Sequence, residues 1–267
     1  MSTDTVILVA AYNEASRIEA TLAALAGAFP GAKVWVADDG STDATALVAR
    51  HAGARVVRSE RTIGKGAAMT LAAREALEDA RSNENARAHE RGRVPSPMSN
   101  VSPEPRPGAR EETSDRQALQ DEPIFVLCDG DLAGSAGGLG VIADILRRGE
   151  ADMAVAIFAT RVGGGVGLAV GFARWAIRRR CGLRLRAPIS GQRALRACVL
   201  EDVLPFAQGF GMEIGMTIDA ARAGHRIAEI ELELSHRATG RTFAGFLHRG
   251  RQLIDFVGVF LDRRKRH

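Results

Sequence analysis

The stretch that decides the fold is Thr5-Val-Ile-Leu-Val-Ala-Ala-Tyr-Asn-Glu14. Its first seven residues form a short apolar run, which is typical of a β-strand buried on both faces. The polar residues Tyr12, Asn13 and Glu14 follow directly, where the strand is expected to end. Because strands buried on both faces occur mainly in parallel sheets covered by helices, this stretch predicts an α/β fold.

The same alternation continues along the chain. Apolar residues recur at helical spacing in 15–28 and 42–51, and the alanine-rich run 65–80 favours a helix. Further strands are predicted at 33–37, 55–58, 124–128, 153–158 and 226–234, and further helices at 139–148 and 212–223. Repeated strand–helix units are typical of a mostly parallel twisted sheet flanked by helices. We therefore expect one α/β domain over residues 1–267.

Residues 82–122 interrupt this alternation. They contain five prolines among Ser, Glu, Arg and Asn, with almost no large apolar side chains. Such a segment buries too little surface to offset its ordering entropy, so a disordered surface insertion is predicted. A lid that orders over substrate is the alternative, because function often lies in long loops.

Composition narrows the class of protein. The chain has 267 residues, 46% of them hydrophobic, and a net charge of +4, which favours anionic partners only weakly. Three scattered cysteines fit a reducing compartment better than a disulfide framework. Polar residues follow Met1 and no apolar run reaches about 20 residues, so we expect neither a signal peptide nor a spanning helix. We expect a cytoplasmic protein with at most peripheral contact to the inner face of the membrane, and a homodimer is left open.

Three polar clusters follow predicted strands: 12–14, Asp38-Asp-Gly-Ser-Thr-Asp43 and Asp129-Gly-Asp131. Ligands of parallel α/β sheets bind outside the carboxyl ends of the strands, so we expect these clusters to converge. Two carboxylates around a glycine can hold a divalent cation, which neutralises a nucleoside-diphosphate leaving group. Asp131 is then the direct ligand, and Asp129 reaches the ribose or a metal-bound water. An acidic turn is the plainer interpretation of this triplet alone.

The other clusters also have plain interpretations. Ser41 or Thr42 is expected to cap the helix that follows, with Asp43 favouring its dipole. Asp38 and Asp39 precede that cap, where they could accept hydrogen bonds from a base or ribose. Lys65 lies between two glycines at the start of a helix, where an ammonium can approach an anion.

Taken in order, these motifs resemble those of the family-two glycosyltransferases with the GT-A (Rossmann-like) fold. The matching stretches are Val6–Glu14, Asp38–Asp43, Gly64–Ala67 and Asp129–Asp131, followed by Gly209–Gly215 and Ser235–Arg237. The last two resemble the branch of glucosyl-3-phosphoglycerate synthase and the polyprenyl-phosphate sugar transferases. Ala10 departs from the family, which usually has proline there.

The resemblance implies roles for individual residues. It places the donor nucleotide against Ala11, Asn13, Glu14, Asp39, Lys65, Asp129 and Gly130. It implies Mg²⁺ or Mn²⁺ bound by Asp131 and His236. The stretch Ser190-Gly191-Gln192-Arg193 resembles the acceptor-side loop, with Ser190, Gly191 and Arg193 as acceptor ligands.

Two of the C-terminal residues have a plainer alternative. Glu213 is set between glycines in an apolar run, which favours a carboxylate that points into a pocket, and a general base is its sharpest role. A carboxylate on the helix surface is the alternative. His236 alone is more often a structural histidine than a metal ligand, although imidazole suits Mn²⁺.

Basic residues are concentrated in the C-terminal half: Arg174, Arg178, Arg179, Arg180, Arg184, Arg186 and Arg193. Guanidinium groups suit a phosphate-bearing acceptor, and a solvated basic helix is the alternative. Residues 242–267 are predicted to form an amphipathic helix and a basic tail. Packing on the domain explains its apolar face, and an anionic membrane is a second possible partner.

The expected function is metal-dependent transfer of a sugar from a UDP- or GDP-linked donor. The acceptor is expected to be phosphorylated, either a polyprenyl phosphate or a small metabolite. A sugar-phosphate nucleotidyltransferase is one alternative, but it usually has a basic glycine-rich loop after the first strand. A non-catalytic nucleotide-binding or membrane-scaffold protein is another. Nucleic acid is not expected as a partner, because the arginines lack interleaved aromatic residues.

Overall fold

The computed structural model describes residues 4–91, 122–158, 168–208 and 211–232. The strands are β1 Thr5–Ala11, β2 Lys33–Asp38, β3 Arg55–Arg58, β4 Ile124–Asp129, β5 Met153–Phe158, β6 Arg193–Arg196 and β7 Ile227–Leu232. The helices are α1 Ile18–Ala28, α2 Thr45–His51, α3 Lys65–Arg91, α5 Gly140–Arg147, α6 Leu168–Cys181, α7 Ala197–Val203 and α8 Met212–Arg222, with a 3₁₀ helix η1 at Ala133–Leu139.

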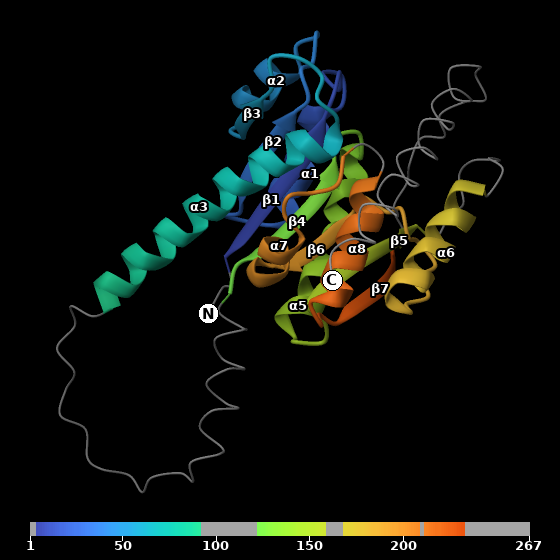
Figure 1. Cartoon of the computed structure of the whole chain (residues 1–267). Helices are drawn as coiled ribbons and strands as arrows, with labels where there is room; N and C mark the ends of the chain where they lie inside the picture. The colour runs from blue at the N-terminus through green and yellow to red at the C-terminus, as the bar shows by residue number, and fades with distance from the viewer. Residues whose placement is uncertain (1–3, 92–121, 159–167, 209–210, 233–267) are drawn as a thin grey trace, which may run out of the picture.

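These strands form one mixed sheet in the order β3-β2-β1-β4-β6-β5-β7 (Figure 1). β1 is parallel to β2 and to β4, and β2 is parallel to β3. Only β6 runs against its neighbours, β4 and β5, while β5 and β7 are parallel to each other. The predicted α/β fold with a mostly parallel sheet and flanking helices is confirmed.

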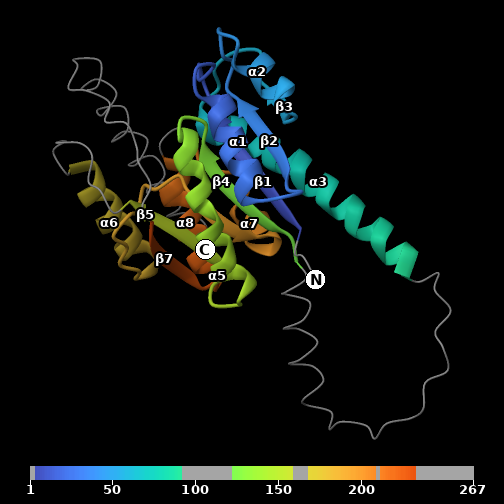
Figure 2. The same ribbon diagram turned by 180° about the vertical axis from the view of Figure 1, so that it is seen from behind.

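The sheet has an apolar core on each face, because the side chains of a strand alternate between its two sides. In β1, Ile7 and Val9 pack toward α1, η1 and α5, whereas Val6 and Leu8 pack toward α3, α7 and α8. Figure 2 shows the molecule from the α1 and α5 side. A smaller cluster joins α6 to α8, so α6 lies at the outside of the second layer. The strand ends are thus held rigidly from both sides.

Helix α3 is longer than predicted. It continues to Arg91 instead of ending near Ala80, so the predicted insertion cannot begin at 82. Residues 81–91 are rich in Ala, Glu and Arg, which favour helices, and Arg87 pairs with Asp4. The prolines of the predicted insertion lie in 92–121, outside the described residues.

One further prediction of secondary structure was wrong, and two elements were missed. Helix α2 begins at Thr45, and neither Ser41 nor Thr42 caps it, since Ala44 occupies the N-cap position and Asp43 Oδ1 accepts the backbone N–H of Thr45 at 2.9 Å. The strand β6 and the helix α7 were not predicted at all. The predicted helix and tail in 242–267 lie outside the described residues. Within the described ranges, no helix combines the length and the hydropathy needed to cross a bilayer.

Candidate functional site

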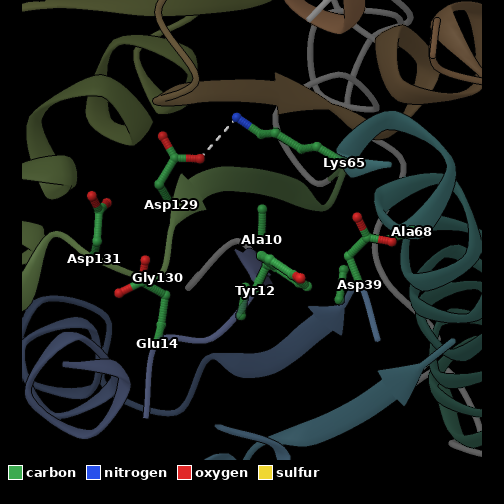
Figure 3. Close-up of a pocket in the computed structure, with 11 residues that line it drawn as sticks. Ala10, Tyr12, Glu14, Asp39, Lys65, Ala68, Asp129, Gly130 and Asp131 are labelled. Atoms are coloured by element: carbon green, nitrogen blue, oxygen red, sulfur yellow. Dashed lines mark ion pairs between the residues drawn. The ribbon is translucent and has the colours of Figure 1, made fainter. Parts of the chain in front are cut away.

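A cavity of about 400 Å³ opens at the carboxyl edge of β1, β2 and β4 (Figure 3). It is lined by Ala10, Ala11, Tyr12, Glu14, Ala37, Asp39, Lys65, Ala68, Asp129, Gly130 and Asp131. The three polar clusters therefore converge as predicted. We call this space the donor cavity. Four carboxylates and one ammonium line it, so the cavity carries an excess of acidic side chains.

Asn13 fixes the loop after β1 but does not line the cavity. Its φ angle is +56°, in the left-handed region that asparagine tolerates better than most residues. Its backbone N–H donates to Ser41 Oγ at 2.9 Å, and its Oδ1 accepts the backbone N–H of Thr42 at 2.8 Å. Asn13 thus ties the first loop to the second, and Ser41 and Thr42 serve this junction instead of capping α2.

The two aspartates after β2 have different surroundings. Asp38 is fully buried, accepts the backbone N–H of Ser41 at 2.9 Å and lies 3.4 Å from the Arg58 guanidinium, so its predicted contact with a base or ribose is wrong. Asp39 lines the cavity and accepts the backbone N–H groups of Ile63 and Gly64 at 2.7 and 3.0 Å. These bonds hold its carboxylate at the base of the donor cavity.

The turn Asp129-Gly130-Asp131 is locked onto β1 and α1. The N–H of Gly130 donates to Ala10 O at 2.8 Å, and a Cβ at Gly130 would lie 3.0 Å from Ile18 Cδ1. Thr21, which is fully buried, donates to Gly130 O and accepts from the N–H of Ala133, both at 2.8 Å. The direction of both aspartates is therefore set by backbone contacts.

Lys65 joins α3 to two carboxylates. Its Nζ lies 2.8 Å from Asp129 Oδ1 and 2.9 Å from Glu213 Oε1. Burial alone would lower the pKa of Lys65, but the two carboxylates outweigh it and raise the pKa well above its usual value. Glu213 itself is buried in the first turn of α8 and lines neither this cavity nor the second one described below, so it does not point into either of them as was predicted.

The other side of the donor cavity carries two carboxylates, those of Glu14 and Asp131. Burial raises the pKa of Glu14, and Asp131 raises it further despite the nearby Arg17. Asp131 Oδ1 is buried and has no hydrogen-bond partner among the described residues. A buried carboxylate oxygen without a donor fits a cation ligand. His236, the other predicted ligand, lies outside the described residues, and within them no group of three or more His, Cys, Asp or Glu side chains could hold a metal.

A second cavity of about 270 Å³ opens beside the first. It is lined by Asp129, Val170, Arg186, Ala187, Pro188, Ile189, Ser190, Gly191 and Gln192. Asp129 is the residue that lines both cavities. Ser190 and Gly191 lie where an acceptor-side loop was predicted. We call this space the acceptor cavity.

Arg193 does not reach the acceptor cavity. It is fully buried and donates to Ser190 O at 2.8 Å, Pro188 O at 3.3 Å and Thr217 Oγ1 at 2.9 Å. Burial lowers its pKa to about 10, although Glu213 acts in the opposite direction. Arg193 was predicted to bind the acceptor, but its side chain does not line this cavity. It instead holds the loop that forms the cavity wall.

The remaining arginines divide between structural and exposed positions. Arg174 donates to the carbonyls of Leu185 and Arg186, so it shapes the same loop. The Arg186 guanidinium lies 3.2 Å from Glu231 and is two-thirds exposed, with 67% of its side-chain surface accessible. Arg178 and Arg179 are exposed on α6. Arg186 is therefore the guanidinium at the acceptor cavity.

The decisive comparison concerns the N-terminal segment. The model of glycosyl transferase family 2 matches residues 6–80, which include β1, β2 and Lys65. Residues 6–80 are thus similar to glycosyl transferase family 2. The expected enzyme class, a glycosyltransferase, is confirmed at the level of this segment. No curated protein sequence matches the chain.

Solved structures share the fold over almost the whole chain. A structure of glucosyl-3-phosphoglycerate synthase from Mycobacterium tuberculosis in complex with phosphoglyceric acid is 22% identical, with a TM-score of 0.61, and the match covers 98% of this chain and 80% of that one. A complex of the same enzyme with Mn²⁺, UDP-glucose and phosphoglyceric acid gives 22% identity, a TM-score of 0.62 and the same coverage. A complex with Mn²⁺, UDP-glucose and glycerol 3-phosphate gives 24% identity, a TM-score of 0.59, and again 98% and 80%. The predicted GT-A architecture is thus confirmed beyond the family 2 segment.

Two functional positions were missed by sequence reasoning. Thr21 lies inside a predicted helix, where a threonine gives no signal that it bonds a distant turn. Gln192 donates from Nε2 to Asp129 Oδ2 at 2.8 Å. Its place beside Gly191 in the acceptor-side motif was visible, but its partner depends on β6, which the sequence did not reveal.

Proposed function

We propose that the chain transfers a sugar from a UDP-linked donor to a small phosphorylated acceptor with the help of a divalent cation. The observation that carries the proposal is the pair of adjoining cavities that share Asp129, the first of them lined mainly by residues of the stretch 6–80 that matches the family 2 model. A donor and an acceptor bound in the two cavities meet at that side chain.

Residues of the donor cavity suit a nucleoside diphosphate. The loops after β1 and β2 provide a floor of small side chains, Ala10, Ala11 and Ala37, with Asp39 held at its base. A UDP-linked donor is preferred to a GDP-linked one, because the structurally similar synthase binds UDP-glucose. We assign the donor to Ala11, Glu14, Asp39, Lys65 and Gly130, and Asn13 to the geometry of their loop.

Asp131 is the residue that we assign to the cation. Asp131 Oδ1 has no hydrogen-bond partner among the described residues, and the carboxylate of Asp131 raises the pKa of Glu14. A cation bound at this point would offset both unfavourable effects. Mg²⁺ or Mn²⁺, with His236 as the proposed second ligand, would neutralise the charge that develops on the departing diphosphate. Lys65 is ion-paired with Asp129 and Glu213, which keeps it protonated. We therefore assign it a fixed positive charge and no role in proton transfer.

The acceptor cavity suits a compact phosphorylated molecule. Arg186 provides the cation at its wall, and Ser190 provides a hydroxyl. A volume of about 270 Å³ fits a small metabolite better than a long lipid chain. The related structures hold phosphoglyceric acid or glycerol 3-phosphate, which supports a small acceptor of this kind. We leave the general-base role of Glu213 out of the mechanism, because its carboxylate is paired with Lys65 outside both cavities.

A thermal-shift screen with UDP, GDP and their sugars, with and without Mn²⁺, tests the donor assignment. Stabilisation should require both the metal and a uridine nucleotide, since a ligand that binds only the folded state raises the midpoint. Release of UDP should then depend on a phosphorylated acceptor such as 3-phosphoglycerate. A guanosine nucleotide that stabilises as well as UDP would contradict the assignment of the base.

Asp131→Asn tests the cation assignment. The variant should lose the metal-dependent part of the UDP shift and at least 100-fold in turnover, a loss of the size seen when a charge-stabilising group is removed. Asp144→Asn is the matched control, because Asp144 is exposed on α5 and pairs only locally with Arg147. An Asp131→Asn enzyme with unchanged metal dependence would show that the cation binds elsewhere.

A further inference from the structure

Asp129 forms the wall between the two cavities and is held from two sides. On one side, Lys65 Nζ lies 2.8 Å from its Oδ1. On the other, Gln192 Nε2 donates to its Oδ2 at 2.8 Å. Lys65 belongs to α3 and Gln192 to the loop before β6, so the two partners come from the donor and the acceptor sides of the site.

Gln192 is a rigid support for this bond. Only 1% of its surface is exposed, and its carbonyl oxygen accepts the backbone N–H of Ala156 in β5 at 2.9 Å. Its side-chain Oε1 lies 3.4 Å from Ser190 Oγ, which lines the acceptor cavity. Since its backbone is anchored in the sheet, the amide has little freedom to follow Asp129 if that carboxylate moves.

The chemistry of the amide matches the position. A carboxamide donates a hydrogen bond without adding charge, so it orients Asp129 while leaving the ion pair with Lys65 intact. The adjacent Gly191 provides the space, because a Cβ there would lie 2.8 Å from Lys65 Nζ and 3.0 Å from Asp129 Oδ2. Lys65, with Glu213 behind it, and Glu14 are among the charged groups that act on Asp129 from other elements.

We propose that Gln192 is a positioning residue that holds Asp129 at the junction of the two cavities and so aligns the donor with the acceptor. The inference rests on the proposed transfer function. It assigns Gln192 no contact with the reacting atoms, since its effect is transmitted through Asp129. Without the amide, the Asp129 carboxylate is free to rotate toward Lys65. Because Asp129 lines both cavities, this rotation would change the shape of both.

Gln192→Met tests this role, because methionine is similar in length and cannot donate the bond. We expect kcat to fall about tenfold to a hundredfold, as for loss of a hydrogen bond to a charged group, with a smaller change in the KM of the donor. Gln208→Met is the matched control, since Gln208 is exposed and lines neither cavity, and its kinetics should be unchanged.

Coupling to Asp129 is measured by a double-mutant cycle with Asp129→Asn. If Gln192 acts through Asp129, the double variant should be no slower than Asp129→Asn alone, and the UDP-dependent thermal shifts of these two variants should also agree. Additive losses, or a Gln192→Met enzyme with the parent kcat, would overturn the inference.

A second variant guards against a folding defect. Gln192→Glu keeps the size and polarity but sets a carboxylate against Asp129, so at neutral pH it should be slower than Gln192→Met while the protein still unfolds cooperatively. A Gln192→Glu enzyme as active as the parent would also overturn the inference. Failure of the proposed function is distinct, because the parent protein would then show neither metal-dependent UDP binding nor transfer.

Discussion

Gly191 shows how closely the two halves of the site approach each other. It separates the loop before β6 from the ion pair of Lys65 and Asp129, and its lack of a side chain leaves just enough space. A methyl group at this point would press on the far end of Lys65, which two carboxylates hold in place. The residue therefore controls the geometry of the site more than the stability of the fold.

Gly191→Ala should lower kcat by at least tenfold while changing the unfolding midpoint by only a few degrees, because Lys65 or Asp129 must shift but the backbone need not. Steady-state kinetics and thermal unfolding measure the two effects. Gly171→Ala is the control, since a Cβ at Gly171 would meet nothing within 4 Å. Equal kinetics for both variants would show that the Lys65–Asp129 pair has room to relax.

Thr21→Val should destabilise the protein by about 1–3 kcal/mol, because it leaves the Gly130 carbonyl and the Ala133 N–H buried without their partner. The turn that carries Asp131 should loosen as well, so the concentration of Mn²⁺ needed for half of the UDP-dependent stabilisation should rise. Chemical denaturation and a metal titration check the two parts. Thr62→Val, at an exposed position, is the comparison.

At the scale of elements, two ion pairs of Asp79 join helix α3 to the strands β2 and β3. Asp79 lies 2.6 Å from Lys33 of β2 and 2.6 Å from Arg55 of β3. The hydrogen bond from Lys33, followed by that from Arg55, holds the pKa of Asp79 below its usual range against the opposing effect of burial. One carboxylate thus connects the long helix to two parallel strands, of which β2 borders the donor cavity at its carboxyl end.

Asp79→Asn should lower the free energy of unfolding by about 1 kcal/mol at pH 7, a modest loss because the pairs are partly exposed. A depressed pKa in the folded state stabilises the fold above the unfolded value near about 4 and ceases to do so as the pH falls through the folded value. The difference between parent and variant should therefore be constant from neutral pH to about pH 5 and shrink below about pH 4. Urea denaturation at several pH values measures it, and a difference that grows with acidity would contradict this role.

Much of the donor cavity could be predicted from the apolar strand patterns and from the polar residues that follow each strand. The run Thr5–Ala11 is apolar throughout and is β1, and the polar clusters after the strands meet because parallel strands end on one edge. β6 could not be predicted in this way, because its four residues include Arg193 and Arg196, which are both buried. An arginine in a sequence indicates surface, and only tertiary contacts reveal one whose hydrogen bonds are satisfied inside the protein.

On the scale of the whole molecule, the connection between α3 and β4 joins two points that lie close together. Arg87 pairs with Asp4, and the N–H of Ile124 donates to the carbonyl of the same residue. The last turns of α3 therefore lie within reach of the start of β4. We expect the proline-rich stretch 92–121 to contribute little to the fold.

Replacing residues 92–121 by about 12 Gly and Ser residues, which span roughly 20 Å, should leave the unfolding midpoint within a few degrees of the parent value. The shorter loop should even favour the fold slightly, because closing it costs less entropy. The UDP-dependent shift should also persist. Loss of that shift, with the fold intact, would identify the segment as the lid that is the alternative to a disordered insertion.

The reversed direction of β6 has a consequence for how the molecule can change. Because β6 is antiparallel to β4, the residues that precede it, and not those that follow it, arrive beside Asp129. Most residues that line the acceptor cavity therefore lie between α6 and β6, whereas the residues that we assign to the donor come from segments nearer the N-terminus. We therefore expect that exchange of residues 182–190, with Gly191 and Gln192 kept, can change the acceptor without altering the residues assigned to the donor.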